Sequence, residues 1–195
     1  MPLTGAAAAR LYDDHVDAIY ALVTRRVGPA ASADIVAETF EHALRSWDRF
    51  DQNKGTERLF LFGAAVSVLR SHGAVEREFL RTLGLRNDVT SSVTVVDPLV
   101  NGQPTRAPRV VAHAANEDLL GGANTTDAPT GSALMVAIAD LPPDDRDIVL
   151  LSLWESCPQA AIAETLDLSV GAVRSALGRI RRELKNATTK PRGRS

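Results

Sequence analysis

Hydrophobic residues recur at the spacing of one helix face in the first part and in the last part of this 195-residue chain. Near the amino terminus this spacing predicts a helix over residues 12–27, ended by the pair Gly28-Pro29. A second helix is predicted over residues 33–47, with Ser32 as its amino-terminal cap. Its other face is polar and largely acidic.

A third, strongly apolar helix is expected to begin near Leu59. It either stops at Gly73 or resumes as far as Leu83, where Gly84 would be a good terminator. No stretch of this part alternates in the manner of a strand. We therefore expect an all-α fold.

The pattern is lost between residues 85 and 131, which are rich in Pro, Gly, Asn, Thr and Ser and carry a mild excess of acids. A long stretch without pattern is natural between two domains and unusual inside one. The sequence therefore predicts a helical domain over 1–84, a flexible acidic linker over 85–131, a second small helical domain over 132–187 and a basic tail over 188–195.

The second domain ends in the pattern of a helix-turn-helix. Val173, Leu177, Ile180 and Leu184 form one helical stripe, and Ser169 stands where the amino-terminal cap of that helix is needed. The preceding helix is expected over 159–166. The three-residue turn that joins the two would place Asp167 in a left-handed conformation and Leu168 in the angle between the helices.

The side of the last helix opposite its apolar stripe is small and basic. It holds Gly171, Arg174, Ser175, Gly178, Arg179, Arg182 and Lys185. A helix anchored by one face with Arg, Ser and Gly on the other suits the DNA major groove. The plainer alternative is an amphipathic helix pair that closes a small core and leaves its cations in water.

Composition narrows the function further. The formal net charge is -2, with 45% hydrophobic residues, and no apolar run approaches the roughly 20 residues that span a membrane. Cys157 is the single cysteine, so a cytoplasmic location is the expectation. The four histidines lack metal-ligand spacing, and no catalytic motif is visible. We expect no enzyme activity, no catalytic residue, no metal and no cofactor.

Several short motifs, in this order, resemble the two-domain extracytoplasmic-function (group 4) sigma factors, which belong to the sigma-70 family. Residues 34–40 read D-I-V-A-E-T-F and resemble that family's D-L-V-Q-E-T-F helix, with W-D-R-F at 47–50. Residues 60–65 resemble its W-L-f-g-I-A element. In the second domain, Leu141-Pro142 with Arg146 and residues 169–175 with Arg179 resemble its L-P…R-e-v and S-v-G-T-V-k-S…R-A motifs.

The resemblance implies a division of labour. An acidic helix face would dock on the clamp helices of the largest subunit of core RNA polymerase; its residues are Asp34, Glu38, Thr39, Glu41 and Arg45. The loop before the third helix and that helix would hold the melted −10 promoter strand through Asn53, Lys54, Arg58, Phe60 and Arg70. The recognition helix would read the −35 element through Ser169, Gly171, Ala172, Arg174, Ser175, Arg179, Arg182 and Lys185.

The implied partners are core RNA polymerase (the clamp helices, and the flap of the second-largest subunit), promoter DNA and an optional anti-sigma protein, with no membrane insertion. The chain departs from the family after Ala65, where a basic run is replaced by residues 66–73 with few cations. Its hold on DNA is therefore expected to depend heavily on polymerase. Two alternatives stay open: a stand-alone helix-turn-helix regulator, and a sigma-like adaptor without promoter-melting activity.

Overall fold

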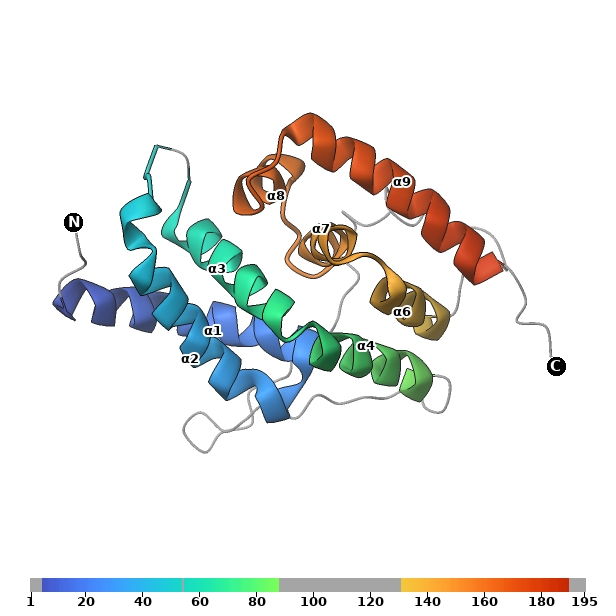
Figure 1. Ribbon diagram of the computed structural model, residues 1–195, viewed down its shortest axis with the longest axis horizontal. Helices are drawn as coiled ribbons and strands as arrows, with labels where there is room; N and C mark the ends of the chain where they lie inside the picture. Colours follow the sequence, from blue (N-terminus) through green and yellow to red (C-terminus); the bar gives the residue numbers. More distant parts are fainter. Residues whose placement is uncertain (1–4, 54, 88–130, 190–195) are drawn as a thin grey trace.

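The structure is a computed structural model that describes residues 5–53, 55–87 and 131–189. Every regular element in these ranges is helical (Figure 1). They are α1 (Gly5–Val27), α2 (Pro29–Arg45), the 3-10 turn η1 (Trp47–Arg49), α3 (Glu57–Ser71), α4 (Gly73–Asn87), α6 (Gly131–Asp140), α7 (Pro143–Leu153), α8 (Gln159–Thr165) and α9 (Val170–Thr189). The all-α prediction is confirmed. The expected linker and basic tail lie almost wholly outside the described residues.

The α1–α2 corner is built differently from the prediction. Gly28 has a φ of 80°, and a side chain there would also strike the ring of Phe79. Pro29 opens α2 at a position where its missing N–H is not needed. Ser32 is not the cap. It lies inside α2, fully buried, where its hydroxyl donates to the Gly28 carbonyl and accepts from Thr24.

The structure confirms the third predicted helix, but Gly84 does not end a helix. Thr56 caps α3 by accepting a hydrogen bond from the Leu59 amide at 3.3 Å. After His72 the chain turns into α4, which runs through Gly84 to Asn87. Gly84 is buried, so a helix can pass through this glycine because the surrounding packing outweighs its weak helix propensity.

The helix-turn-helix prediction is confirmed in most of its detail. Asp167 has a φ of 53°, and the Ser169 hydroxyl accepts from the Ala172 amide at 3.1 Å. The four stripe residues from Val173 to Leu184 are buried against the rest of the domain. Leu168 does not fill the angle between the helices. The residue is 41% exposed, whereas Ile162 and Ala163 of α8 are buried.

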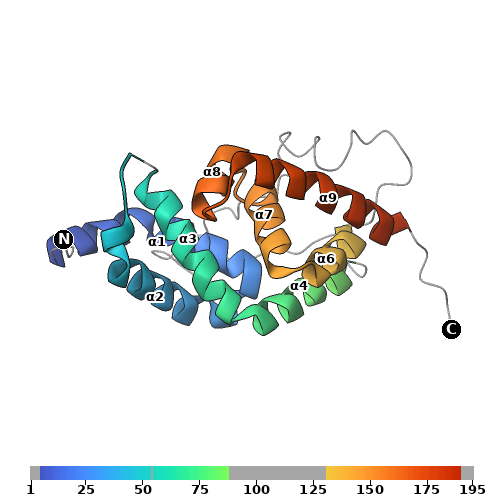
Figure 2. The ribbon, with the colours of Figure 1, turned by 45° about the horizontal axis from the view of Figure 1, so that its top comes forward.

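The two helical halves pack directly on one another. Helix α4 lies along α6, and α3 lies against α8, as both views show (Figures 1 and 2). Buried hydrophobic residues of both halves belong to one continuous core. The two predicted helical domains are present, and in this conformation they share an interface.

The cap of α3 gives a direct stability test. Replacing Thr56 by Ala removes the side-chain acceptor for the Leu59 amide and should lower the free energy of unfolding by about 1 kcal/mol. Urea unfolding of the full chain measures the change. Ser67, exposed in the middle of α3, is the control, because Ser67→Ala removes no cap and should change stability by less than about 0.5 kcal/mol. Equal losses in the two variants would refute the capping role.

Candidate nucleic-acid interface

Helix α9 presents a small, basic surface to solvent. Arg174, Ser175 and Arg182 are exposed, while Val173 and Ile180 on the opposite side are buried. The helix lies at the outer edge of the molecule, away from α1 and α2 (Figure 2). The whole predicted −35 set is exposed: Ser169, Gly171, Ala172, Arg174, Ser175, Arg179, Arg182 and Lys185. A duplex can therefore reach this face without any rearrangement of the chain.

Arg179 is already engaged within its own domain. Both of its terminal nitrogens donate to the Asp145 carboxylate of α7, with Nη2 to Oδ1 at 2.7 Å. The hydrogen bond and the charge of Asp145 raise the pKa of Arg179, which stays a cation. This fork-to-carboxylate pair fixes α9 on α7. Arg174 and Arg182 form no ion pair among the described residues and are the better candidates for base or phosphate contacts.

The second candidate surface is the loop before α3 and the start of that helix. Asn53 is exposed and donates to Asp51 at 3.0 Å. Arg58 is exposed, with its guanidinium carbon 5.0 Å from the centre of the Phe62 ring. Phe62 itself is buried, so it belongs to the core. Lys54 lies outside the described residues.

Phe60 belongs to an aromatic cluster that the sequence motifs only partly indicated. Its ring centre lies 5.4 Å from those of both Trp47 and Phe50, and these two lie 4.7 Å apart. All three side chains are only partly buried. The W-D-R-F motif was the available signal for this cluster. The turn η1 brings the first residue of the motif, Trp47, close to its last residue, Phe50. Half-exposed rings of this kind can stack on nucleic-acid bases.

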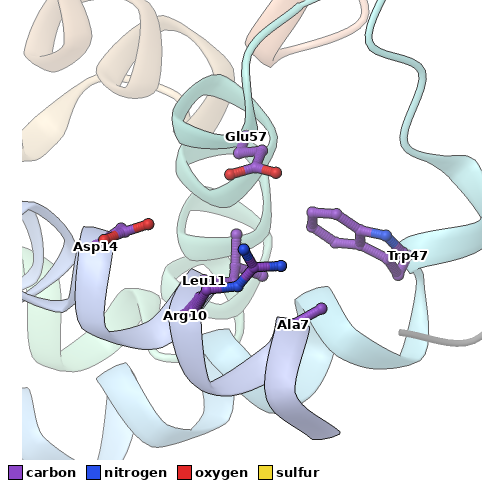
Figure 3. A pocket seen from close by; sticks show the side chains of 6 residues that line it. All are labelled: Ala7, Arg10, Leu11, Asp14, Trp47 and Glu57. Atoms are coloured by element: carbon purple, nitrogen blue, oxygen red, sulfur yellow. The ribbon is translucent and has the colours of Figure 1, made fainter. Parts of the chain in front are cut away.

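A small hollow of about 190 Å³ opens beside Trp47 (Figure 3). Its lining residues come from α1, η1 and the start of α3; they are Ala7, Arg10, Leu11, Asp14, Trp47 and Glu57. Arg10 faces the hollow together with two carboxylates, as the close-up shows. The single cation is therefore opposed by two acids, and the hollow offers little attraction to phosphate.

Arg70, the last predicted −10 residue, is not free for DNA in this conformation. Its Nη2 lies 2.8 Å from Asp144 and its Nε donates to Asp147 at 2.8 Å, both in α7. The α3 surface and the helix-turn-helix domain are thus joined by charge pairs. No local pattern indicates these pairs, because the partners are more than 70 residues apart along the chain.

The predicted polymerase-docking face lies on α2. Asp34, Glu38 and Glu41 are exposed there; Glu38 lies 2.9 Å from His72, and Glu41 pairs with Arg45 one turn along. Thr39 does not belong to this face. It is fully buried and its hydroxyl donates to the Ile35 carbonyl at 2.7 Å, because position 39 falls on the core side of the helix.

Cys157 is half-buried. Burial, with a smaller contribution from Glu155, raises the pKa of its thiol, while Arg58 acts in the opposite direction. The thiol is therefore mainly protonated and a poor nucleophile. Within the described ranges no group of three or more His, Cys, Asp or Glu side chains could hold a metal ion. No helix described there is both long and apolar enough to cross a bilayer.

Comparison with known proteins agrees with this arrangement. Residues 11–73 match the family model Sigma-70 region 2, and residues 132–184 match Sigma-70, region 4. No curated protein matches the chain significantly in sequence. Two helical domains, one of them ending in a helix-turn-helix whose last helix exposes a basic face, fit these two family models. Together the two matches cover more than half of the chain. The chain belongs to the sigma-70 family.

Two solved structures match the chain at low sequence identity. The structure of CnrH in complex with the cytosolic domain of CnrY matches with a TM-score of 0.53 and 19% identity, over 94% of this chain and 88% of that one. The sigma factor RpoE in complex with the anti-sigma factor NepR from Bartonella quintana matches with a TM-score of 0.49 and 16% identity, over 94% and 98%.

The two arginines on α9 should differ in their effect on stability. Arg179→Ala leaves the nearly buried Asp145 carboxylate without its guanidinium and should lower the melting temperature of the chain. Arg174→Ala removes an exposed side chain and should leave the melting temperature unchanged. Differential scanning calorimetry measures both. A melting temperature that falls equally, or for Arg174→Ala alone, would contradict the assignment.

Proposed function

We propose that this chain is a group 4, extracytoplasmic-function-type sigma factor that directs core RNA polymerase to a specific set of promoters. The observation that carries the proposal is the exposed basic face of α9, held on a buried apolar stripe and capped at Ser169. In this role the recognition helix reads the −35 element, and the polymerase carries out catalysis. The chain acts in the cytoplasm, where the polymerase is located.

The amino-terminal domain contributes polymerase docking and the −10 contact. The acidic face of α2 offers a negative surface to the clamp helices of the largest subunit. The half-exposed cluster of Trp47, Phe50 and Phe60, with Arg58 nearby, offers stacking surfaces for unpaired bases. Few cations surround this cluster, which favours a factor that relies on polymerase for affinity.

The helix-turn-helix domain contacts the flap of the second-largest subunit while it binds the −35 element. Control by an anti-sigma protein is compatible with this proposal. CnrH, which has a similar fold, was solved bound to the cytosolic domain of CnrY.

A stand-alone helix-turn-helix regulator is the second candidate, and free-protein DNA binding separates the two. A regulator binds its site unaided, whereas the proposed sigma factor binds promoter DNA weakly until core polymerase is added.

The α9 assignment predicts a specific loss of promoter affinity. Arg174→Ala should weaken binding of the holoenzyme to promoter DNA by about 1–3 kcal/mol if Arg174 contacts a guanine by two hydrogen bonds. A mobility-shift titration with double-stranded promoter measures the change. Arg10, exposed on α1, supplies the matched Arg→Ala control and should have no such effect. Unchanged affinity in Arg174→Ala would remove the recognition-helix assignment.

The docking assignment predicts a loss of polymerase binding after charge reversal. Asp34→Lys combined with Glu38→Lys should abolish co-purification with core polymerase, because an acidic surface becomes basic. Without polymerase, binding of this variant to DNA through its helix-turn-helix should not be weaker than that of the unaltered chain. Asp13→Lys with Asp17→Lys reverses two exposed acids at the same spacing on α1 and is the control. Co-purification of the α2 variant at normal yield would refute the docking face.

A further inference from the structure

Helix α9 begins with side chains that cannot form hydrogen bonds. After the cap, its first turn consists of Val170, Gly171, Ala172 and Val173. Val173 is buried in the domain, whereas the other three residues are exposed. The hydroxyl of Ser169 is held by the Ala172 amide at 3.1 Å, as the cap of the helix. The exposed side chains of this first turn can therefore make only apolar contacts.

An exposed apolar tip, formed by Leu168, Val170 and Ala172, lies at this end of the helix-turn-helix. Leu168 is 41% exposed and Val170 is 40% exposed. They are two of the six large hydrophobic residues that lie exposed in the described part of the chain. The turn that carries them lies at the outer rim of the molecule (Figure 1). Burial within the chain therefore accounts for only part of their apolar surface.

The backbone of the apolar tip is held in place by hydrogen bonds. The Leu168 amide donates to the Ala163 carbonyl at 2.7 Å, and the Val173 amide donates to the Ser169 carbonyl at 3.1 Å. Val170 is β-branched, and a single side-chain rotamer of valine dominates in helices. Its two methyl groups are therefore presented in a fixed direction. Little side-chain entropy is lost when such a group contacts a ligand.

The apolar tip continues directly into the basic face of α9. Arg174 and Ser175 follow it by one turn, and both are exposed. Cationic side chains attract the phosphate backbone and bring a duplex to this side of the helix. In helix-turn-helix proteins, the residues at the start of the recognition helix contact the edges of bases in the major groove. The occupant that suits the apolar tip is therefore a DNA base edge.

The major groove offers one apolar group, which is the C5-methyl group of thymine. Guanine, adenine and cytosine present only hydrogen-bonding atoms there. Such atoms lose water against an apolar side chain and gain no partner in return, which costs free energy. An apolar side chain that enters the groove at this point therefore favours thymine over the other three bases.

We propose that Val170, together with Ala172, selects thymine in the −35 element by contact with its C5-methyl group. Arg174 and Ser175, one turn further along α9, read neighbouring base pairs by hydrogen bonds. This inference rests on the function proposed above and adds the base that the start of α9 selects. The −35 elements of the selected promoters should share an A·T pair whose thymine faces Val170.

Deoxyuridine tests the methyl contact, because it lacks the C5-methyl group of thymidine and pairs with adenine in the same way. The probes are promoter fragments that the holoenzyme retains from genomic DNA, with each −35 thymine replaced singly by uracil. Mobility-shift titration with the holoenzyme measures the affinity. At one or more of these thymines the unaltered chain should lose about fourfold in affinity, as expected for one methyl group returned to water. Equal affinity for thymine and uracil at every −35 position would overturn the proposal.

The variant Val170→Ala separates a methyl contact from an effect of uracil on the shape of the DNA. It removes two methyl groups at an exposed position and introduces a better helix former, so the fold should be kept. Its affinities for the thymine and uracil probes should be nearly equal, as a double-mutant cycle requires for a direct contact. The matched control is Val75→Ala, at a 43% exposed position of α4, which should keep the fourfold preference.

Two results with Val170→Ala would refute the contact. In the first, the preference for thymine over uracil is as large as in the unaltered chain. In the second, the affinity falls by the same factor on both probes, which would assign the apolar tip to a protein surface rather than to thymine.

A methyl group placed on another base gives the converse test. Cytosine in place of the sensitive thymine should weaken binding, and 5-methylcytosine at that position should restore about fourfold in affinity for the unaltered chain but not for Val170→Ala. Equal affinity for cytosine and 5-methylcytosine would contradict the proposal. If the holoenzyme retains no promoter fragment, the proposed function fails and this inference fails with it. Retained fragments that show no effect of uracil overturn the inference alone.

Discussion

The arrangement of this molecule depends on the burial of Arg26. A guanidinium removed from water must be surrounded by carboxylates, and the two that surround it come from α4 and α7. Helices α1, α4 and α7 are therefore brought to one point, and α7 carries the helix-turn-helix domain with it. The direct contacts of α4 with α6 and of α3 with α8 follow from the same placement.

This constraint divides the surfaces of the chain into open and covered ones. The acidic residues of α2 and the basic residues of α9 face solvent on different sides, while Arg70 and the middle of α3 face α7 and α8. The acidic face of α2 and the basic face of α9 are thus separate surfaces on a chain that is nearly neutral overall. Arg70 of α3 pairs with Asp144 and Asp147 of α7, so these charges join the two halves.

Local patterns predicted the elements well and the contact between the two helical halves not at all. The stripe from Val173 to Leu184, the left-handed Asp167 and the cap at Ser169 could be predicted because each depends on neighbours within a few residues. The pairing of Arg26 with Asp147 spans 121 positions and leaves no periodic signal.

The errors share one cause, which is that packing overrode local preference. Ser32 was expected as a helix cap and Thr39 on the docking face that the resemblance implies. Both are buried, and each hydroxyl donates to the carbonyl four residues earlier. Leu168 was expected inside and is exposed. Glycine alone did not end α4, since Gly84 is enclosed by its surroundings. A correct prediction at each of these residues would have required the position of a distant helix.

The central claim is that this chain gives promoter selectivity to core RNA polymerase. The most direct measurement is transcription in vitro from fragmented genomic DNA with purified core polymerase, with and without the chain, followed by mapping of the RNA 5′ ends. The account predicts a small set of new start sites, preceded by shared sequence elements at fixed distances and absent with core enzyme alone. Start sites that are unchanged when the chain is added would contradict it.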